Sequence, residues 1–191
     1  MGAREILLHW KGPVNFERFA EKKSPPDLIE VDRTGIYLHC LRMAEAFAVI
    51  YVGKADPTSV WSRNKQHYRN IKKFSWAFFD WKGFENRDDL DVTFIPNYDD
   101  KSESETKRDP AQLIERLSLF YAPYSGDENI SGIEGAIQIH LWRNMATRKY
   151  LITPISNYSL RDKIIENDFD CKDTILGFNG GNRVIRTPSP Q

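Results

Sequence analysis

Apolar segments along the chain predict several short strands. Residues 35–41 and 47–52 are rich in β-branched and aromatic side chains, and we expect them to form a hairpin. Residues 75–81 and 91–95 have the same character and are separated by an acidic turn that contains glycine. The pattern therefore predicts a β-sheet whose first part is a hairpin.

Apolar residues at helical spacing predict helices after the hairpin and in the second half of the chain. Asp56 and the proline after it suit an N-cap and a first turn, so we expect a helix from Asp56 to about Lys73. Residues 111–121 and 131–145 also carry apolar side chains one helical turn apart. Residues 97–110 are polar and predict a mobile loop.

Composition favours a soluble protein from a reducing compartment. The chain has 191 residues, 40% of them hydrophobic, which is enough to bury one core. No segment approaches the roughly 20 apolar residues of a membrane span, and the start of the sequence has no signal-peptide pattern. Cys40 and Cys171 are too few for a disulfide framework, so we expect two free thiols. These features predict a cytoplasmic protein without a membrane partner.

Charged residues are segregated along the chain, although its formal net charge is zero. Residues 57–79 contain five bases and no acid, whereas residues 84–106 contain eight acids and two bases. A basic helix can present a positive face to nucleic-acid phosphates, although such a run often forms only a solvated surface. The candidate DNA-binding bases are Lys65, Arg69, Lys72 and Lys73.

Two tripeptides occur at the predicted hairpin, and the basic helix follows them. Gly35-Ile36-Tyr37 begins the first strand, Tyr51-Val52-Gly53 ends the second, and Arg63 lies on the helix. His67 follows Arg63 by one helical turn, so both side chains lie on one face of the helix. This ordered set resembles the GIY-YIG nuclease superfamily.

The resemblance implies the positions of the catalytic groups. Members of this superfamily combine two tyrosines, an arginine and often a histidine with a glutamate that binds a metal ion. Here Glu134 matches that glutamate, which implies Mg²⁺ or Mn²⁺ as the cofactor. A late asparagine of the family matches Asn157, with Asn144 as the rival position. The implied catalytic residues are Tyr37, Tyr51, Arg63, His67 and Glu134.

The resemblance also implies an α+β fold and a division of the chain. Its core is a small twisted sheet, mixed or antiparallel, flanked by helices, and it covers residues 34–158. Residues 82–130 form an insertion in this core, and residues 1–33 form an N-terminal extension. Residues 159–191 form a C-terminal extension with a loose tail from residue 180. Such additions are where we expect sequence selectivity toward DNA.

Phosphodiester hydrolysis explains why these residue types belong together. A divalent ion on one carboxylate relieves charge on the leaving oxygen, and the Arg63 guanidinium suits the phosphoryl oxygens. Tyr37 is the first candidate for the general base. His67 is the alternative base or an orienting group, and Tyr51 holds the water or the phosphate.

Three further residues have open interpretations. Lys54 follows the second tripeptide and can contact phosphate or lower the pKa of a phenol, but a solvated lysine is an equal alternative. His39 faces the same side of its strand as Tyr37, so it either supports the site or only packs there. Glu134 also fits a capping box that begins at Ser131.

We therefore expect a divalent-metal-dependent endonuclease that hydrolyses double-stranded DNA. The compact chain with insertions favours a sequence-specific type II restriction enzyme, and a palindromic target would favour a homodimer. A DNA-repair or mobile-element nuclease is the near alternative, and a catalytically silent nucleic-acid-binding module is another. If the motif residues only pack, Tyr37, Tyr51, Arg63 and Glu134 should not converge on one wet hollow.

Overall fold

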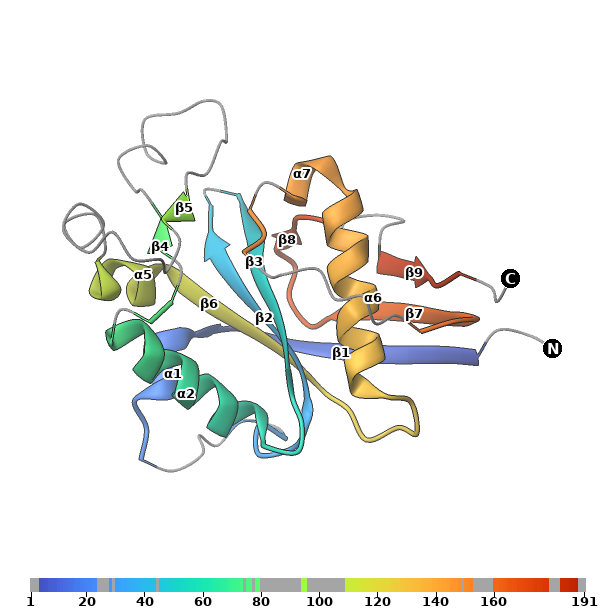
Figure 1. Ribbon diagram of the computed structural model, residues 1–191, viewed down its shortest axis with the longest axis horizontal. Helices are drawn as coiled ribbons and strands as arrows, with labels where there is room; N and C mark the ends of the chain where they lie inside the picture. Colours follow the sequence, from blue (N-terminus) through green and yellow to red (C-terminus); the bar gives the residue numbers. More distant parts are fainter. Residues whose placement is uncertain are drawn as a thin grey trace.

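An α+β fold is formed by the parts of the chain that the structure describes. The computed structural model describes residues 4–23, 28, 30–43, 45–73, 75–76, 78–79, 94–95, 109–148, 150–152, 160–178 and 183–188. Among these residues, seven strands form one curled sheet with helices on both faces (Figure 1). The sheet is mixed, which agrees with the predicted fold class.

The strands lie in an order that differs from their order in the sequence. From one edge to the other they are β8 (Thr174–Ile175), β3 (Ala46–Ala55), β2 (Gly35–Arg42), β6 (Leu117–Pro123), β1 (Arg4–Asn15), β7 (Lys163–Phe169) and β9 (Val184–Arg186). β1 pairs with β7 and β3 pairs with β8 in parallel, and the other neighbours are antiparallel. β2 and β3 form the predicted hairpin.

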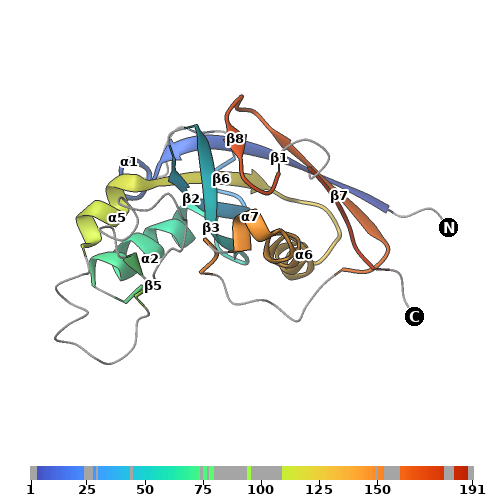
Figure 2. The same ribbon diagram turned by 90° about the horizontal axis from the view of Figure 1, so that it is seen from above.

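Helices cover the two faces of the hairpin strands, and the sheet separates two hydrophobic cores. α1 (Phe16–Ala20), α2 (Val60–Lys72) and α5 (Pro110–Arg116) lie on one side, and α6 (Ile130–Arg143) lies on the other, followed by α7 (Met145–Arg148). Figure 2 shows β2 and β3 between α2 and α6. The alternation along β2 follows from this arrangement, because Ile36 and Leu38 pack toward α6 whereas Tyr37 and Leu41 pack toward α1, α2 and α5.

The strands predicted at residues 75–81 and 91–95 are confirmed in part. β4 (Phe78–Phe79) and β5 (Phe94–Ile95) form an antiparallel pair, in register at Phe78 and Ile95. Residues 75–76 are described and are not in a strand, so the first prediction is wrong there. The other residues of both predicted strands, and residues 97–108 of the predicted loop, lie outside the described residues.

The predicted helix over residues 111–121 is wrong in its second half. α5 ends at Arg116, and Leu117 begins β6, which lies between β2 and β1. A central strand is buried on both faces, so its apolar run does not alternate. A continuous apolar run can match a helical spacing by chance. This is the case for Leu113, Leu117 and Phe120, of which only Leu113 is in a helix.

Both ends of the chain contribute to the sheet. The predicted N-terminal extension contains β1, whose Ile6, Leu8 and Trp10 are buried, and the predicted insertion contains β6. The expectation of a loose tail is wrong for Val184–Arg186, because this segment pairs with β7. β9 has only three residues, and the apolar run of β6 has a helical spacing, so the sequence pattern did not indicate these strands.

Candidate active site

A hollow of about 250 Å³ lies at one end of the hairpin, where α2 and α6 begin. Its walls come from the end of β3, the loop after it, and the N-terminal parts of the two helices. Two cations, two carboxylates and a phenol therefore face one space. The lining residues are Tyr51, Lys54, Asp56, Thr58, Arg63 and Glu134.

The elements meet here because the second half of β3 is an edge within the described sheet. β8 pairs with β3 only at Ala46 and Phe47, so no described strand lies outside the segment from Tyr51 to Ala55. α2 packs on one face of the hairpin and α6 on the other. Arg63 and Glu134, one from each helix, thus reach the same hollow around the edge of the sheet.

A chain of hydrogen bonds leads from this hollow into the core. Tyr51 is half-buried at the hollow, and its phenol is hydrogen-bonded to that of Tyr37. Tyr37 is fully buried behind it, and its phenol oxygen lies 2.6 Å from Nε2 of His67. Nη1 of Arg63 donates a hydrogen bond to Oε1 of Gln66 at 2.6 Å. We call His67, Tyr37 and Tyr51 the phenol–imidazole chain.

Gly53 makes room for the Tyr37 ring. The two residues lie directly opposite each other in the register of β2 and β3. A Cβ on Gly53 would lie 2.4 Å from both Cζ and the phenol oxygen of Tyr37, and 2.6 Å from Cε1 of Tyr51. The positions of both tyrosine rings therefore depend on the glycine of the second tripeptide.

The buried ring nitrogen of His67 indicates the direction of these hydrogen bonds. Its Nδ1 has no hydrogen-bond partner among the described residues. A buried N–H without a partner costs about 1–3 kcal/mol, and such orphaned donors are rarer than orphaned acceptors. The tautomer with the proton on Nε2 is therefore favoured. In that tautomer His67 donates to Tyr37, Tyr37 donates to Tyr51, and the Tyr51 oxygen is the acceptor at the hollow.

Burial keeps the phenol–imidazole chain uncharged. It raises the pKa of Tyr37 well above its usual value, and the pKa of Tyr51 also rises, while the positive charge of Arg63 opposes both increases. The hydrogen bond from Tyr37 lowers the pKa of Tyr51. Burial lowers the pKa of His67 to about 2, so its imidazole is neutral near pH 7. Of the two phenols, Tyr51 is therefore the one whose ionised form is disfavoured less by its surroundings.

Glu134 faces the hollow and does not cap its own helix. The N-cap of α6 is Asn129, whose side chain accepts a hydrogen bond from the backbone N–H of Ser131 at 2.8 Å. The capping-box alternative is therefore wrong, because α6 begins at Ile130 and Glu134 lies beyond the N3 position. Burial raises the pKa of Glu134, and the charges of Lys54 and Arg63 oppose that rise.

Lys54 connects β3 to α6. Its Nζ donates a hydrogen bond to the hydroxyl of Ser131, and its side chain is half-buried at the hollow. This contact contradicts the alternative of a solvated lysine. It also holds the ammonium group on the same wall as Glu134.

The hollow fits a hard divalent cation bound through one main carboxylate. Mg²⁺ and Mn²⁺ prefer oxygen ligands, and Mg²⁺ usually keeps several waters beside one or two carboxylates. Glu134 is half-buried beside water-accessible space, and Asp56 is exposed on the same lining. No group of three or more His, Cys, Asp or Glu side chains that could hold a metal occurs in the described residues. The donor set therefore suits an ion whose remaining ligands are water and phosphate oxygens.

His39 lies on the same face of β2 as Tyr37 but does not line the hollow. It is fully buried, and its Nε2 lies 2.6 Å from Oδ1 of Asn64 on α2. Helical spacing places Asn64 on the same face of α2 as Val60, Tyr68 and Ile71, but no motif marks it as a site residue. Its contact with His39 is known only once the helix has been docked on the sheet.

The structure adds further residues to the predicted site. Asp56 was expected to cap α2, but the N-cap is Ser59, whose hydroxyl accepts a hydrogen bond from the backbone N–H of Ser62 at 3.1 Å. Asp56 lines the hollow instead. Short polar residues near helix starts usually cap or face solvent, so the sequence carried no separate signal for these positions. The added residues are Asp56, Thr58, Asn64 and Ser131.

The predicted DNA-binding bases of α2 do not line the hollow; they are Lys65, Arg69, Lys72 and Lys73. Helical spacing places the first three on the face opposite Arg63. Two of them make contacts within the protein. Lys65 donates to the carbonyl oxygen of Lys22 at 2.9 Å, and Nζ of Lys72 lies 3.6 Å from the carboxylate of Glu21. The other two bases are exposed.

Neither candidate for the late asparagine joins the described site. Asn157 lies outside the described residues. Asn144 follows the last residue of α6 and ends that helix. It lies about 15 Å along the helix axis from Glu134.

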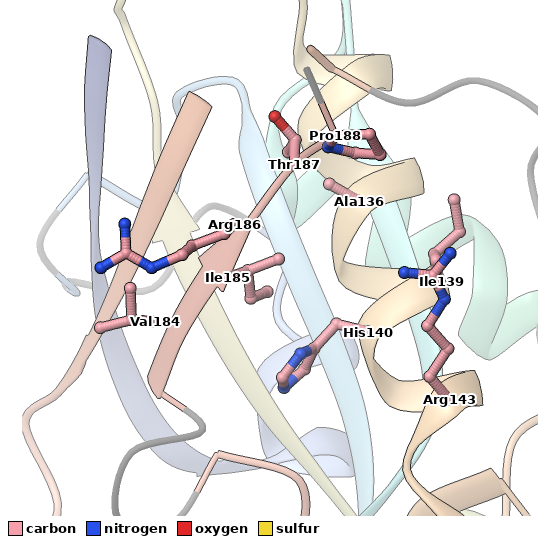
Figure 3. Close-up of a pocket in the computed structure, with 9 residues that line it drawn as sticks. All are labelled: Ala136, Ile139, His140, Arg143, Val184, Ile185, Arg186, Thr187 and Pro188. Atoms are coloured by element: carbon pink, nitrogen blue, oxygen red, sulfur yellow. The ribbon is translucent and has the colours of Figure 1, made fainter. Parts of the chain in front are cut away.

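A second hollow of about 180 Å³ lies between α6 and β9 (Figure 3). Figure 3 shows the guanidinium groups of Arg143 and Arg186 on opposite sides of this hollow. Nε2 of His140, a third polar residue of its lining, donates to the carbonyl oxygen of Gly177 at 2.9 Å. Its charged groups do not converge on one point, and no predicted site residue lines it.

No protein-family model, no curated protein and no solved structure matches this chain. Within the described residues, no helix is long and apolar enough to cross a membrane. The function therefore has to be inferred from the chemistry of the hollow around Tyr51, Arg63 and Glu134.

Proposed function

We propose that this chain is a divalent-metal-dependent endonuclease of double-stranded DNA with a GIY-YIG-like catalytic core. The observation that carries the proposal is the convergence of Tyr51, Lys54, Arg63 and Glu134 on one hollow, with Tyr37 hydrogen-bonded behind it. These residues come from elements on both faces of the sheet. Packing alone gives no reason for two cations, a carboxylate and a phenol to gather there.

Glu134 would hold Mg²⁺ or Mn²⁺ together with water and phosphate oxygens. When bound, such an ion supplies positive charge at the leaving oxygen and offsets the Glu134 charge that raises the pKa of Tyr51. Burial already disfavours the bare anion of Glu134, so the carboxylate gains from a cation beside it.

Tyr51 would accept the proton of the attacking water. It faces the hollow, accepts a hydrogen bond from Tyr37 and lies in the field of Arg63, and the last two features favour its ionised form. Tyr37, the first candidate from the sequence, then acts one step behind it as a hydrogen-bond donor. Neutral His67 orients Tyr37 through Nε2.

Arg63 and Lys54 would bind the phosphate whose ester bond is cut. A guanidinium offers two parallel donors to non-bridging oxygens, and this two-point geometry suits the charge that grows on them in the transition state. Lys54 is held in place by Ser131, so its ammonium adds a second fixed positive charge.

The reaction then balances as a hydrolysis. Tyr51 first loses its phenol proton to solvent. The water oxygen then forms a bond to phosphorus while one of the water protons moves to the Tyr51 phenolate. The bond between phosphorus and the 3′-oxygen breaks, and that oxygen leaves with the electron pair and takes a proton from solvent. The products are a 5′-phosphate and a 3′-hydroxyl.

The more specific proposal is a sequence-specific type II restriction enzyme that acts in the cytoplasm. A small generic catalytic hollow carries little base selectivity, so the bases would be read by other parts of the chain. A homodimer would match a palindromic target. The exposed bases of α2 would contact flanking phosphates and not the scissile one, because they face away from Arg63.

The decisive experiment compares wild type with Glu134→Gln on plasmid DNA in Mg²⁺, in Mn²⁺ and in EDTA. We expect wild type to cut only with metal, and Glu134→Gln to lose cleavage but keep its affinity for a labelled duplex, because no positive charge is removed. Glu166→Gln, an exposed residue of β7, is the matched control and should cut like wild type.

Mapped fragment ends would test the restriction assignment, because discrete ends indicate a defined target and a smear indicates low selectivity. Full activity in Glu134→Gln, or cleavage in EDTA, would contradict the metal site. Binding of DNA without cleavage of plain, modified or branched substrates would favour a silent binding module over an endonuclease.

A further inference from the structure

A second buried hydrogen bond lies beside the phenol–imidazole chain. Nε2 of His39 on β2 lies 2.6 Å from Oδ1 of Asn64 on α2, and both side chains are fully buried. Nδ2 of Asn64 donates to the carbonyl oxygen of Val60 at 2.8 Å, which fixes the orientation of the amide. The amide oxygen therefore faces His39, and Nε2 of His39 carries a proton.

The His39 ring contacts every member of the phenol–imidazole chain. Its centroid lies 5.3 Å from that of Tyr37, 5.5 Å from that of Tyr51 and 5.4 Å from that of His67. The Tyr51 ring is stacked on it, whereas the His67 ring meets it edge-on. The orientation of His39 thus restricts the orientations of the Tyr37, Tyr51 and His67 rings.

A β-bulge adds to this arrangement. His39 lies opposite Tyr51, but the next residue of β2, Cys40, lies opposite Val49. β3 therefore has one extra residue, Ile50, directly before Tyr51. Bulges redirect the side chains beside them, and the Tyr51 ring beside this bulge is stacked on His39.

We propose that His39, tethered by Asn64, is a positioning residue that holds Tyr51 and His67 in line with Tyr37. The inference rests on the proposed function, because positioning is defined by the reaction that it supports. An apolar pair would fill the same space without the cost of desolvating an imidazole and an amide. The hydrogen bond between Nε2 of His39 and Oδ1 of Asn64 adds a fixed ring orientation, which apolar packing specifies less well. Nδ1 of His39 has no hydrogen-bond partner among the described residues.

A matched control lies on the other face of the sheet. Nε1 of Trp10 donates to Oδ1 of Asn167 at 3.0 Å, and Nδ2 of Asn167 donates to the carbonyl oxygen of Arg183 at 2.8 Å. Both pairs join a buried ring N–H to an asparagine that is anchored to the backbone. Only the His39–Asn64 pair touches the phenol–imidazole chain, so comparison of the two pairs separates positioning from stability.

The test compares His39→Phe with Trp10→Phe in the full chain. We expect His39→Phe to lower kcat for DNA cleavage by up to about 100-fold, the scale for small misplacements of reacting groups, while KM stays near its wild-type value. ¹⁵N NMR of the His67 ring should change from one Nε2–H tautomer to a mixture. Trp10→Phe should lose stability without altering kcat or the His67 signals.

Two more variants keep the test decisive. Asn64→Leu removes the tether without altering His39 and should reproduce both effects if His39→Phe does not fold. His39→Gln retains a donor for Asn64 and should recover part of kcat.

Wild-type His67 signals and kcat in both His39→Phe and Asn64→Leu would overturn the positioning role, as would an equal loss of kcat in Trp10→Phe. If wild type cuts no DNA, the nuclease proposal fails separately. The NMR comparison then still decides whether His39 orders the His67 ring.

Discussion

At the residue scale, the site depends on buried polar groups whose neighbours leave them no alternative position. Tyr37 is enclosed between Gly53, where an added Cβ would lie 2.4 Å from its phenol oxygen, and His67, whose Nε2 lies 2.6 Å from that oxygen. Such a group is sensitive to changes that add even one carbon atom, because buried packing is close to that of an organic crystal.

Gly53→Ala should therefore disturb the site more than one added methyl group would at an open position. The added methyl group would overlap the Tyr37 phenol and displace Tyr51, so we expect a loss of about 1–3 kcal/mol in the free energy of unfolding. We also expect cleavage to fall by up to about 100-fold. Urea unfolding and single-turnover cleavage measure the two effects.

Gly177→Ala is the control for that prediction. Its Cβ would lie 2.5 Å from Cδ2 of Leu141 and 2.9 Å from Cγ2 of Thr147, away from the tyrosines. It should lose stability and keep cleavage. Normal cleavage in Gly53→Ala would contradict the dependence of the tyrosine positions on this glycine.

The buried histidines should make stability depend on pH. Burial lowers the pKa of His39 from 6.5 to about 4, and His67 shifts in the same direction. Below pH 6.5 the unfolded chain binds protons that the folded chain does not, so stability that is present above pH 6.5 is lost as the pH falls toward about 4. The His39 shift corresponds to roughly 3 kcal/mol.

Urea unfolding between about pH 4 and pH 7 checks this prediction, with His39→Phe as the comparison. The variant should show a smaller change in unfolding free energy across that range. An identical pH dependence in the two proteins would mean that His39 is not buried in its neutral form.

The sequence identified the proposed reactive residues better than the residues that hold them in place. Tyr37, Tyr51, Arg63 and Glu134 belong to an ordered set whose spacing is visible in the chain. Asn64 belongs to no motif. Helical spacing places it on the apolar face of α2, but its contact with His39 depends on how α2 docks on the sheet. Polar residues that hold a site in place, such as Asn64, are therefore identified only once the packing of the folded chain is known.

At the element scale, β1 is the clearest difference between expectation and structure. It lies between β6 and β7, although the sequence indicated only an extension there. Trp10 stacks on Phe169 of β7 with ring centroids 5.5 Å apart, and it is fully buried. The extension is therefore part of the sheet that supports the hairpin.

Trp10→Ala should lower the free energy of unfolding by about 3–5 kcal/mol, because it leaves a large cavity in the core. Leu7→Ala, on the same strand but with a residue that is 49% exposed, should cost less than about 1 kcal/mol. Chemical denaturation of both variants measures the difference. Equal losses would mean that β1 does not pack as a central strand.

Helix and strand boundaries were predicted well only where a local signal existed. β2, β3 and α6 match their predicted ranges within a few residues, because β-branched and aromatic residues mark the strands and apolar residues one helical turn apart mark the helix. Leu117–Pro123 forms β6 because it is held between two other strands, and local spacing cannot indicate that.

At the scale of the whole molecule, the sheet combines segments from the whole length of the described chain. Strands from both ends pair with each other in parallel as β1 and β7, and the hairpin reaches them through β6. The candidate site lies where β3 becomes an edge, so helices from both faces contribute to it.

The sequence by itself determined the hairpin, its two tripeptides, the helix with Arg63 and the helix with Glu134, because these depend on local spacing and residue type. Only the tertiary structure decided that Tyr51 faces the hollow, that Tyr37 and His39 are buried behind it, and that β1 and β6 are central strands. Burial depends on contacts between residues that are distant in the chain, and no local pattern encodes those contacts.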